Sequence, residues 1–220
     1  MHLTIKNLIE INEKIKKKIS ELNIKDYKPN VIAVSKTFDL AHISHIISYG
    51  HENFGENKVQ EAFEKWNELK KSNDKIKLHM IGKLQTNKVK LAVSIFDFIH
   101  SVDSEKLALK IAKEIKDQNK NTKIFIQINI GDEEQKSGVS ENNVKNFYNF
   151  CKDINLNVVG IMCIPPFGKS SSPYFSRMSE ISLKLNIKNI SMGMSGDYLD
   201  ALNYGATYLR IGSKIFGKRG

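Results

Sequence analysis

From residue 31 onward the sequence alternates between short apolar segments typical of strands and longer segments with the apolar spacing of amphipathic helices. Such alternation, without a linker or a shift in composition, favours parallel strands joined by helices. Eight such steps in 220 residues predict an α/β chain with one (β/α)8 TIM-type barrel domain over residues 1–220. An additional N-terminal helix over residues 3–23 can fill the gap in the outer ring beside the eighth strand, which has little chain after it.

The expected element boundaries follow from this pattern. Predicted strands cover residues 31–35, 51–54, 77–81, 98–101, 123–130, 158–164, 189–192 and 206–210. Predicted helices after them cover residues 39–49, 56–71, 86–94, 104–118, 140–152, 173–185 and 197–204. An open doubly wound sheet is the alternative. The first strand-to-helix turn, Ser35–Asp39, contains no glycine, whereas a dinucleotide site on such a sheet needs a GxGxxG turn there.

The formal net charge of +10 makes nucleic acid a partner to consider. The lysines are spread over many segments, their longest run is Lys16–Lys18, and no aromatic residues are interleaved with a basic stripe. We therefore expect a solvated helical surface with a modest attraction for anionic ligands, and no nucleic-acid partner. An anion- or RNA-binding module is therefore the weakest functional hypothesis, behind a cofactor carrier and an enzyme.

The cysteines and the apolar runs indicate the compartment. Cys151 and Cys163 stand without CxxC or Cys/His spacing, which predicts a reducing cytoplasm and no metal site. No stretch approaches the roughly 18 uninterrupted apolar residues of a membrane span. The N-terminus lacks an apolar run followed by a small-residue cleavage site. The sequence thus predicts a cytoplasmic protein with no membrane partner.

The first predicted strand, Val31–Ser35, runs directly into Lys36. An amine held at the end of a buried strand is partly desolvated, which lowers its pKa and makes it a better nucleophile towards a carbonyl. Alternatively, Lys36 simply leaves the sheet into water, as most lysines do.

Two loops rich in glycine and hydroxyl side chains follow the seventh and eighth strands, Ser191–Asp197 and Arg210–Ser213. Phosphate often binds after these strands of a barrel, where glycines let backbone N–H groups approach an anion. Because the eighth strand closes against the first, Lys36 is expected beside them. An amine next to a phosphate site is the arrangement that pyridoxal 5′-phosphate (PLP) requires.

Other interpretations of these residues stay open. Gly193 and Gly196 are also typical of ordinary turns, and Arg210 could be a surface ion-pair partner. His79 fits a hydrogen-bonded core histidine or, in an enzyme, a general base, a role that Tyr204 could also take.

Ordered motifs between residues 31 and 217 resemble those of the pyridoxal phosphate homeostasis proteins. The motifs are Ala33-Val34-Ser35-Lys36, Asn53-Phe54-Gly55-Glu56-Asn57, His79-Met80-Ile81-Gly82 with Leu84-Gln85, Gln127-Ile128-Asn129, Lys136-Ser137-Gly138, Gly160-Ile161-Met162, Ser191-Met192-Gly193-Met194-Ser195, and Arg210-Ile211-Gly212-Ser213 with Ile215-Phe216-Gly217. The resemblance implies a barrel similar to the N-terminal domain of alanine racemase, with PLP held as a Schiff base.

The resemblance also assigns roles to individual residues. It implies that Lys36 forms the Schiff base, that Arg210 faces the pyridine nitrogen, and that Asn57 lies at the rim near the cofactor. The residues that it implies for the phosphate are Ser195, Gly212 and Ser213.

These roles favour a carrier over an enzyme. Arg210 beside the ring nitrogen disfavours its protonation and weakens the ring as an electron sink. Racemization also needs a second acid/base group, which alanine racemase takes from another domain. We therefore expect no catalytic residues and a monomer that buffers PLP in vitamin B6 and amino-acid homeostasis, with apo PLP-dependent enzymes as possible recipients. The alternative is a PLP-dependent amino-acid racemase or lyase, and Lys136 is a candidate for a second PLP-binding lysine.

Overall fold

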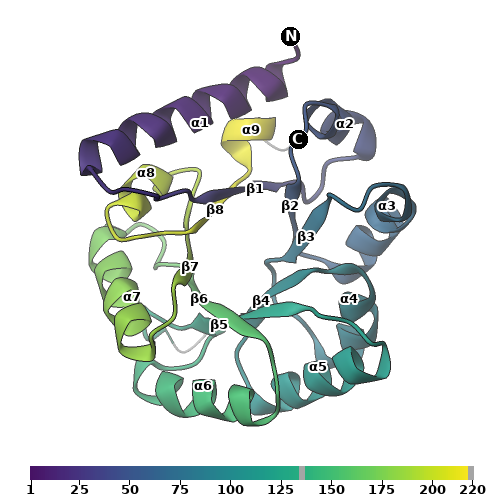
Figure 1. Cartoon of the computed structure of the whole chain (residues 1–220), viewed down its shortest axis with the longest axis vertical. Coiled ribbons are helices and arrows are strands. Elements are labelled where there is room, and N and C mark those ends of the chain that lie inside the picture. Colours follow the sequence, from purple (N-terminus) through teal and green to yellow (C-terminus); the bar gives the residue numbers. More distant parts are fainter. Residues whose placement is uncertain (134–136, 218–220) are drawn as a thin grey trace.

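The computed structural model describes residues 1–133 and 137–217. Its parallel strands follow one another in chain order around a closed barrel, β1 to β8, and helices surround the sheet (Figure 1). The barrel closes through the pairing of β8 with β1, which matches Asn30 with Tyr208 and Ala33 with Ile211. The predicted (β/α)8 barrel is confirmed, and the open doubly wound sheet is wrong.

The described elements lie close to the predicted ranges. The strands are β1 (Asn30–Val34), β2 (Asn53–Glu56), β3 (Lys77–Met80), β4 (Phe98–Val102), β5 (Lys123–Ile128), β6 (Val158–Cys163), β7 (Asn189–Met194) and β8 (Tyr208–Ile211). The helices are α1 (Leu3–Leu22), α2 (Leu40–Ser48), α3 (Val59–Ser72), α4 (Val89–Ile95), α5 (Glu105–Asp117), α6 (Val144–Asp153), α7 (Ser172–Leu185), α8 (Tyr198–Leu202) and α9 (Ser213–Phe216), with 3-10 turns η1 (Thr86–Lys88) and η2 (Glu141–Asn143).

Helix α1 occupies the place in the outer ring that the sequence predicts. It packs on α2, α8 and α9 beside the junction of β8 and β1 (Figure 1). Its buried stripe includes Leu8, Ile11 and Ile15. The short helix α9 was not expected, because little chain remains after β8. It is held against α1 by a hydrogen bond from Asn7 Nδ2 to the carbonyl oxygen of Ile215 (3.0 Å).

The start of helix α3 differs from the prediction in a way that affects the site. Helix α3 begins at Val59 rather than at residue 56, and Glu56 is instead the fully buried last residue of β2. A glutamate is rare in a buried strand, so its position favoured a helix start. The fifth strand ends at Ile128, before the predicted boundary at residue 130.

The apolar core has two layers. The larger one lies between the sheet and the helices and takes the outward-facing isoleucines of β5, Ile124 and Ile126. A separate small cluster of Phe98, Phe125 and Met162 fills the barrel interior. Alternate residues of β5 therefore point to opposite sides of the sheet, and the interior is packed with large side chains rather than hollow.

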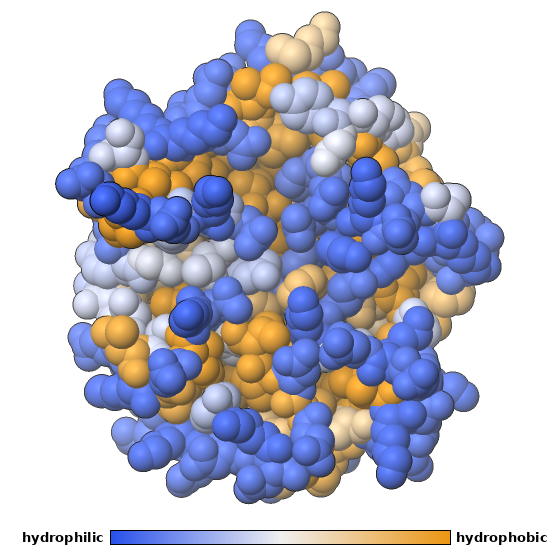
Figure 2. All heavy atoms as spheres, in the orientation of Figure 1, coloured by the Kyte–Doolittle hydropathy of each residue, from blue (hydrophilic) through white to orange (hydrophobic). Residues whose placement is uncertain are grey.

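Hydrophilic residues are dispersed over the face of the molecule seen in Figure 2, with hydrophobic residues visible between them. This fits lysines spread over many segments. Within residues 1–133 and 137–217, none of the helices combines the length and apolar character needed to cross a membrane.

Candidate functional site

A cavity of about 740 Å³ lies at the C-terminal ends of the strands, within the usual size range of small-molecule sites. All the residues predicted for cofactor binding line it: Lys36, Asn57, Ser195, Arg210, Gly212 and Ser213. The remaining lining residues are Val34, Ile81, Gly82, Ile164, Met194 and Gly196. Residues that are up to 177 positions apart in the sequence, from Lys36 to Ser213, therefore meet at one end of the barrel.

The backbone before Lys36 is fixed by a buried cluster on the outer side of the sheet. Glu56 Oε1 accepts hydrogen bonds from Ser35 Oγ (2.7 Å), Lys65 Nζ (3.0 Å) and Trp66 Nε1 (3.0 Å). Lys65 Nζ also donates to the carbonyl oxygen of Ser35 (3.0 Å). These bonds tie the end of β1 to β2 and α3, directly before Lys36, which lines the cavity and is half-buried.

The residue after Lys36 is held in an uncommon conformation. Thr37 has a φ of +70°, which a β-branched residue adopts only at a cost of about 1–3 kcal/mol. Its backbone N–H donates to Glu61 Oε1 (2.7 Å), which also accepts from Lys65 Nζ (3.1 Å). Burial acts to raise the pKa of Glu61, but the Thr37 N–H and the Lys65 ammonium lower it overall. Helix α3 thus clamps the turn on both sides of Lys36.

The loops after β7 and β8 form a cradle of donors. Ser195 Oγ accepts the backbone N–H groups of Gly212 (3.2 Å) and Lys214 (3.4 Å), which are the groups that an anion would bind there. Gly193 permits the loop, because its φ is +86° and a Cβ at this position would lie 2.7 Å from Ala201 Cβ. Backbone donors and the hydroxyls of Ser195 and Ser213 suit a phosphate group.

Arg210 is buried, with 4% of its surface exposed, so the interpretation as a surface ion-pair partner is wrong. Its Nη1 donates to Ser191 Oγ (2.7 Å) and its Nη2 to the carbonyl oxygen of Cys163 (2.8 Å). Burial lowers the pKa of Arg210, yet an arginine remains charged in proteins. The site therefore has a fixed cation with further N–H donors at the wall of the cavity.

Asn57 offers an acceptor in the same cavity. Its Oδ1 is buried and has no hydrogen-bond partner among the described residues. Such an atom fits a site that a ligand completes. Gly82 allows Asn57 its place, because a Cβ at residue 82 would lie 2.4 Å from the Asn57 carbonyl oxygen.

Sequence reasoning missed part of this arrangement. Glu56 and Lys65, which hold the turn, fall within the helix predicted for residues 56–71 with no role in the site, and His100 lies in the predicted strand 98–101 with no role assigned. His79 is a fully buried histidine with two hydrogen bonds, as the core interpretation predicts. Neither His79 nor Tyr204 is among the described residues that line the cavity, and Lys136 lies outside the described residues.

Comparison with known proteins places this geometry in a family. Residues 12–220 match the family described as alanine racemase, N-terminal domain. The pyridoxal phosphate homeostasis protein of Aquifex aeolicus (strain VF5) is 34% identical over 222 residues, covering 96% of each chain. That of Pasteurella multocida (strain Pm70) is 32% identical over 225 residues, covering 97% of this chain and 96% of the relative.

Solved structures agree. PipY of Synechococcus elongatus PCC7942 without PLP gives a TM-score of 0.82 at 30% identity, covering 92% of this chain and 100% of PipY. The PipY structure with PLP bound gives a TM-score of 0.79. Alanine racemase of Clostridium difficile 630 gives 0.71 at 14% identity, covering 99% of this chain and 57% of the racemase, which shows a shared fold alone.

The barrel and the residues at its C-terminal end thus define an α/β protein of the alanine racemase N-terminal-domain type. Within that class, the chain belongs to the family of the pyridoxal phosphate homeostasis proteins.

Proposed function

We propose that the protein binds PLP in the cavity at the C-terminal ends of the strands and carries it, as a Schiff base with Lys36, for vitamin B6 and amino-acid homeostasis. The observation that carries the proposal is the convergence of Lys36, the buried Arg210 and the Ser195–Gly212 cradle on one cavity. The PLP-bound structure of PipY, at 30% identity, supports it.

Each group of the site has a role that its chemistry suits. PLP supplies an aldehyde that condenses reversibly with an amine and releases water. Lys36 Nζ provides that amine. The hydroxyls of Ser195 and Ser213 and the N–H of Gly212 bind the phosphate, while Arg210 donates to the ring nitrogen. Asn57 Oδ1 accepts a hydrogen bond from the cofactor or from a water that accompanies it.

A carrier role fits the site better than turnover. Lys36 and Arg210 are the titratable side chains among the described residues that line the cavity. The cation of Arg210 opposes protonation of the ring nitrogen, which weakens the ring as an electron sink. Proton transfer at a substrate carbon would need a further acid or base on the opposite face. The reversible bond to Lys36 instead suits a protein that stores the aldehyde and releases it.

The proposal extends to the form in which the protein works. We propose that residues 1–220 form one PLP-binding barrel domain that acts as a monomer in the cytoplasm and passes PLP to apo enzymes. It requires neither nucleic acid, metal nor membrane. Analytical ultracentrifugation, with and without PLP, tests the monomer. If the PLP-loaded protein activates an apo transaminase faster than it releases PLP into solution, direct transfer is supported.

The first test is the visible absorption of the purified protein before and after borohydride, with peptide mapping of the reduced product. We expect a band that disappears on reduction and a pyridoxyl group on Lys36. The Lys83→Arg variant is the control, since Lys83 is the nearby lysine that precedes the Leu84-Gln85 motif. A protein that stays colourless with added PLP would contradict the proposal. Exchange of the α-hydrogen of amino acids in D2O would favour the racemase or lyase alternative.

A further inference from the structure

A chain of buried hydrogen bonds leads from the cavity through the interior of the barrel. Arg210 Nη1 lies 2.7 Å from Ser191 Oγ, and Ser191 Oγ lies 2.9 Å from His100 Nδ1. His100 Nε2 lies 3.0 Å from His79 Nδ1, and His79 Nε2 lies 3.0 Å from Asn53 Oδ1. Asn53 begins β2 and lines a cavity of about 400 Å³ at the N-terminal end of the barrel. This series of hydrogen bonds therefore connects the two ends of the barrel.

The donors and acceptors of this chain point one way. A guanidinium has no acceptor, so Ser191 Oγ accepts from Arg210 and is free to donate its hydrogen to His100 Nδ1. His100 then donates from Nε2 to His79 Nδ1, and His79 donates from Nε2 to the Asn53 oxygen. Every N–H or O–H dipole points away from the guanidinium cation, which is the favourable electrostatic direction, and successive bonds polarise one another.

Aromatic neighbours hold both imidazole rings in place. His79 stacks on Phe98 with centroids 4.4 Å apart and an interplanar angle of 6°. His100 stacks on Phe125 with centroids 4.1 Å apart and an angle of 14°. The centroid of the Tyr208 ring lies 5.9 Å from that of His79 and 6.0 Å from that of His100. These contacts restrain both imidazole rings in the orientations in which the hydrogen bonds are made.

The histidines of the chain are neutral. Burial, aided by His51 and Lys70, lowers the pKa of His79 to about 3, and burial, His79 and Arg210 place that of His100 well below its usual value. A neutral His100 can accept from Ser191 without adding a second charge beside Arg210. Barrel interiors are usually filled by Val, Ile and Leu, and buried polar groups are costly unless paired. A fully paired polar chain here points to a task beyond packing.

We propose that Ser191, His100 and His79 are positioning residues for Arg210, and that their one-directional hydrogen bonds fix the guanidinium in the orientation in which it meets the cofactor ring nitrogen. The part that concerns the ring nitrogen rests on the proposed function. The fixed direction of the chain does not, because it is a property of the protein alone.

The direction can be measured in the wild-type protein without cofactor by ¹⁵N NMR of the histidine side chains. We expect His79 and His100 each to carry the proton on Nε2, as single tautomers, and to remain neutral between about pH 5.5 and 8. A proton on Nδ1 of His100, or exchange between tautomers, would overturn the proposed chain. This result does not depend on PLP binding, so it separates the present inference from a failure of the proposed function.

The effect on Arg210 is tested by Ser191→Ala in the PLP-loaded protein. We expect roughly tenfold faster release of PLP, because one charge-assisted hydrogen bond is lost, together with a shifted pH dependence of the visible band. Ser191→Thr keeps the hydroxyl and should restore both.

The matched control is Ser182→Ala. It removes another buried serine hydroxyl, which lies in α7 outside the barrel and donates to the carbonyl oxygen of Ile187. This variant should lose thermal stability as Ser191→Ala does, but keep the wild-type band and release rate. If Ser191→Ala keeps the wild-type visible band and rate of PLP release, the hydrogen-bonded residues only pack the barrel.

Discussion

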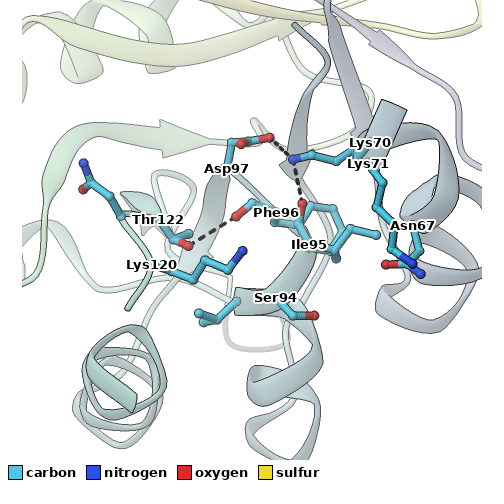
Figure 3. Close-up of a pocket in the computed structure, with 11 residues that line it drawn as sticks. Asn67, Lys70, Lys71, Ser94, Ile95, Phe96, Asp97, Lys120 and Thr122 are labelled. Carbon is cyan, nitrogen blue, oxygen red and sulfur yellow. Dashed lines mark hydrogen bonds and ion pairs between the residues drawn. The ribbon is translucent and has the colours of Figure 1, made fainter. Parts of the chain in front are cut away.

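The two ends of the barrel both carry lysines, polar side chains and a sizeable cavity, yet they differ in where the polar groups point. At the N-terminal end, a cavity of about 490 Å³ lies between the ends of α3 and α4 and the starts of β4 and β5 (Figure 3). There Lys70 Nζ donates to Asp97 Oδ2 (2.5 Å) and to the Ile95 carbonyl oxygen (3.0 Å), and Thr122 Oγ1 donates to the Phe96 carbonyl oxygen (3.2 Å).

At the C-terminal end the polar groups converge on the space instead. Asn57 Oδ1 is buried without a partner among the described residues, and the backbone donors of Gly212 and Lys214 share one serine oxygen, Ser195 Oγ. Charge and cavity volume alone therefore do not mark the functional end of this barrel. The useful signal is a set of donors and acceptors that only a bound molecule can satisfy fully.

The strongest way to break this comparison is to remove the amine at the C-terminal end. We expect Lys36→Ala to lose the covalent pyridoxyl product completely and to weaken PLP retention by roughly 100-fold or more, since the remaining contacts are reversible hydrogen bonds. Lys70→Ala, at the opposite end, should retain PLP as the wild type does. Equilibrium dialysis followed by mass mapping measures both. Equal loss in the two variants would mean that the ends do not differ in function.

The second prediction concerns the cluster that supports Lys36. Glu56→Ala leaves the nearly buried ammonium of Lys65, with 8% of its side chain exposed, without its buried partner. We expect a loss of about 3 kcal/mol in the free energy of unfolding, measured by urea denaturation. The control, Glu68→Ala, removes an exposed glutamate of α3 that pairs with Lys71, and should cost less than about 1 kcal/mol. Similar losses for both would refute a structural role for the buried cluster.

The third prediction is a pH dependence of stability that comes from the interior histidines. The pKa of His79 is about 3 in the folded protein and about 6.5 when unfolded, so the unfolded state binds more protons between these values. Stability from this group is complete above about pH 6.5 and is lost as the pH falls towards 3. The pKa of His100 is lowered in the same direction.

We therefore expect the free energy of unfolding to fall between pH 7 and 5, with a slope of up to about 1.4 kcal/mol per pH unit for each of these histidines. Urea titrations at several pH values measure the slope. The variant His45→Gln changes an exposed histidine and should keep the wild-type slope. A flat profile over this range would show that the buried rings are protonated in the folded state.

The smallest effect is expected from the ion pair at the N-terminal end. Asp97→Asn removes the charge opposite Lys70 but keeps an oxygen that can accept the Leu78 backbone N–H, whose distance to Asp97 Oδ2 is 2.7 Å. Since both side chains of the pair are partly exposed, we expect a loss of about 1 kcal/mol. PLP release should not change. A large effect on PLP release would connect this end of the barrel to the cofactor site.

Several features of the site could be predicted from the sequence because they are local. An apolar run that ends in Lys36 places an amine at the end of a strand, and the Gly/Ser loops after the last two strands are typical of a phosphate site. The repeated alternation of strand and helix predicts the order of the strands. Closure of the barrel then brings Lys36, after the first strand, close to Arg210 in the eighth. Family resemblance then named the cofactor.

Other features could not be predicted, because they depend on residues far apart in the sequence. Ser191 and His100 are 91 positions apart, and their bond exists only because β4 and β7 face each other across the barrel. Glu56 is a helix-start residue by local preference, and its burial depends on donors from Ser35, just after β1, and from Lys65 and Trp66 of α3. No local pattern reports such pairing.

The sequence by itself determined the barrel, its strand order and the end at which the chemistry gathers, because hydrophobic periodicity and turn residues act over short stretches of chain. Only the tertiary structure decided which polar groups satisfy one another and which are left for a ligand. Hydrogen bonds require atoms within about 3 Å and a favourable angle, and that geometry is set by the packing of the whole barrel. The direction of Arg210, held through Ser191 and two neutral histidines, is the clearest case.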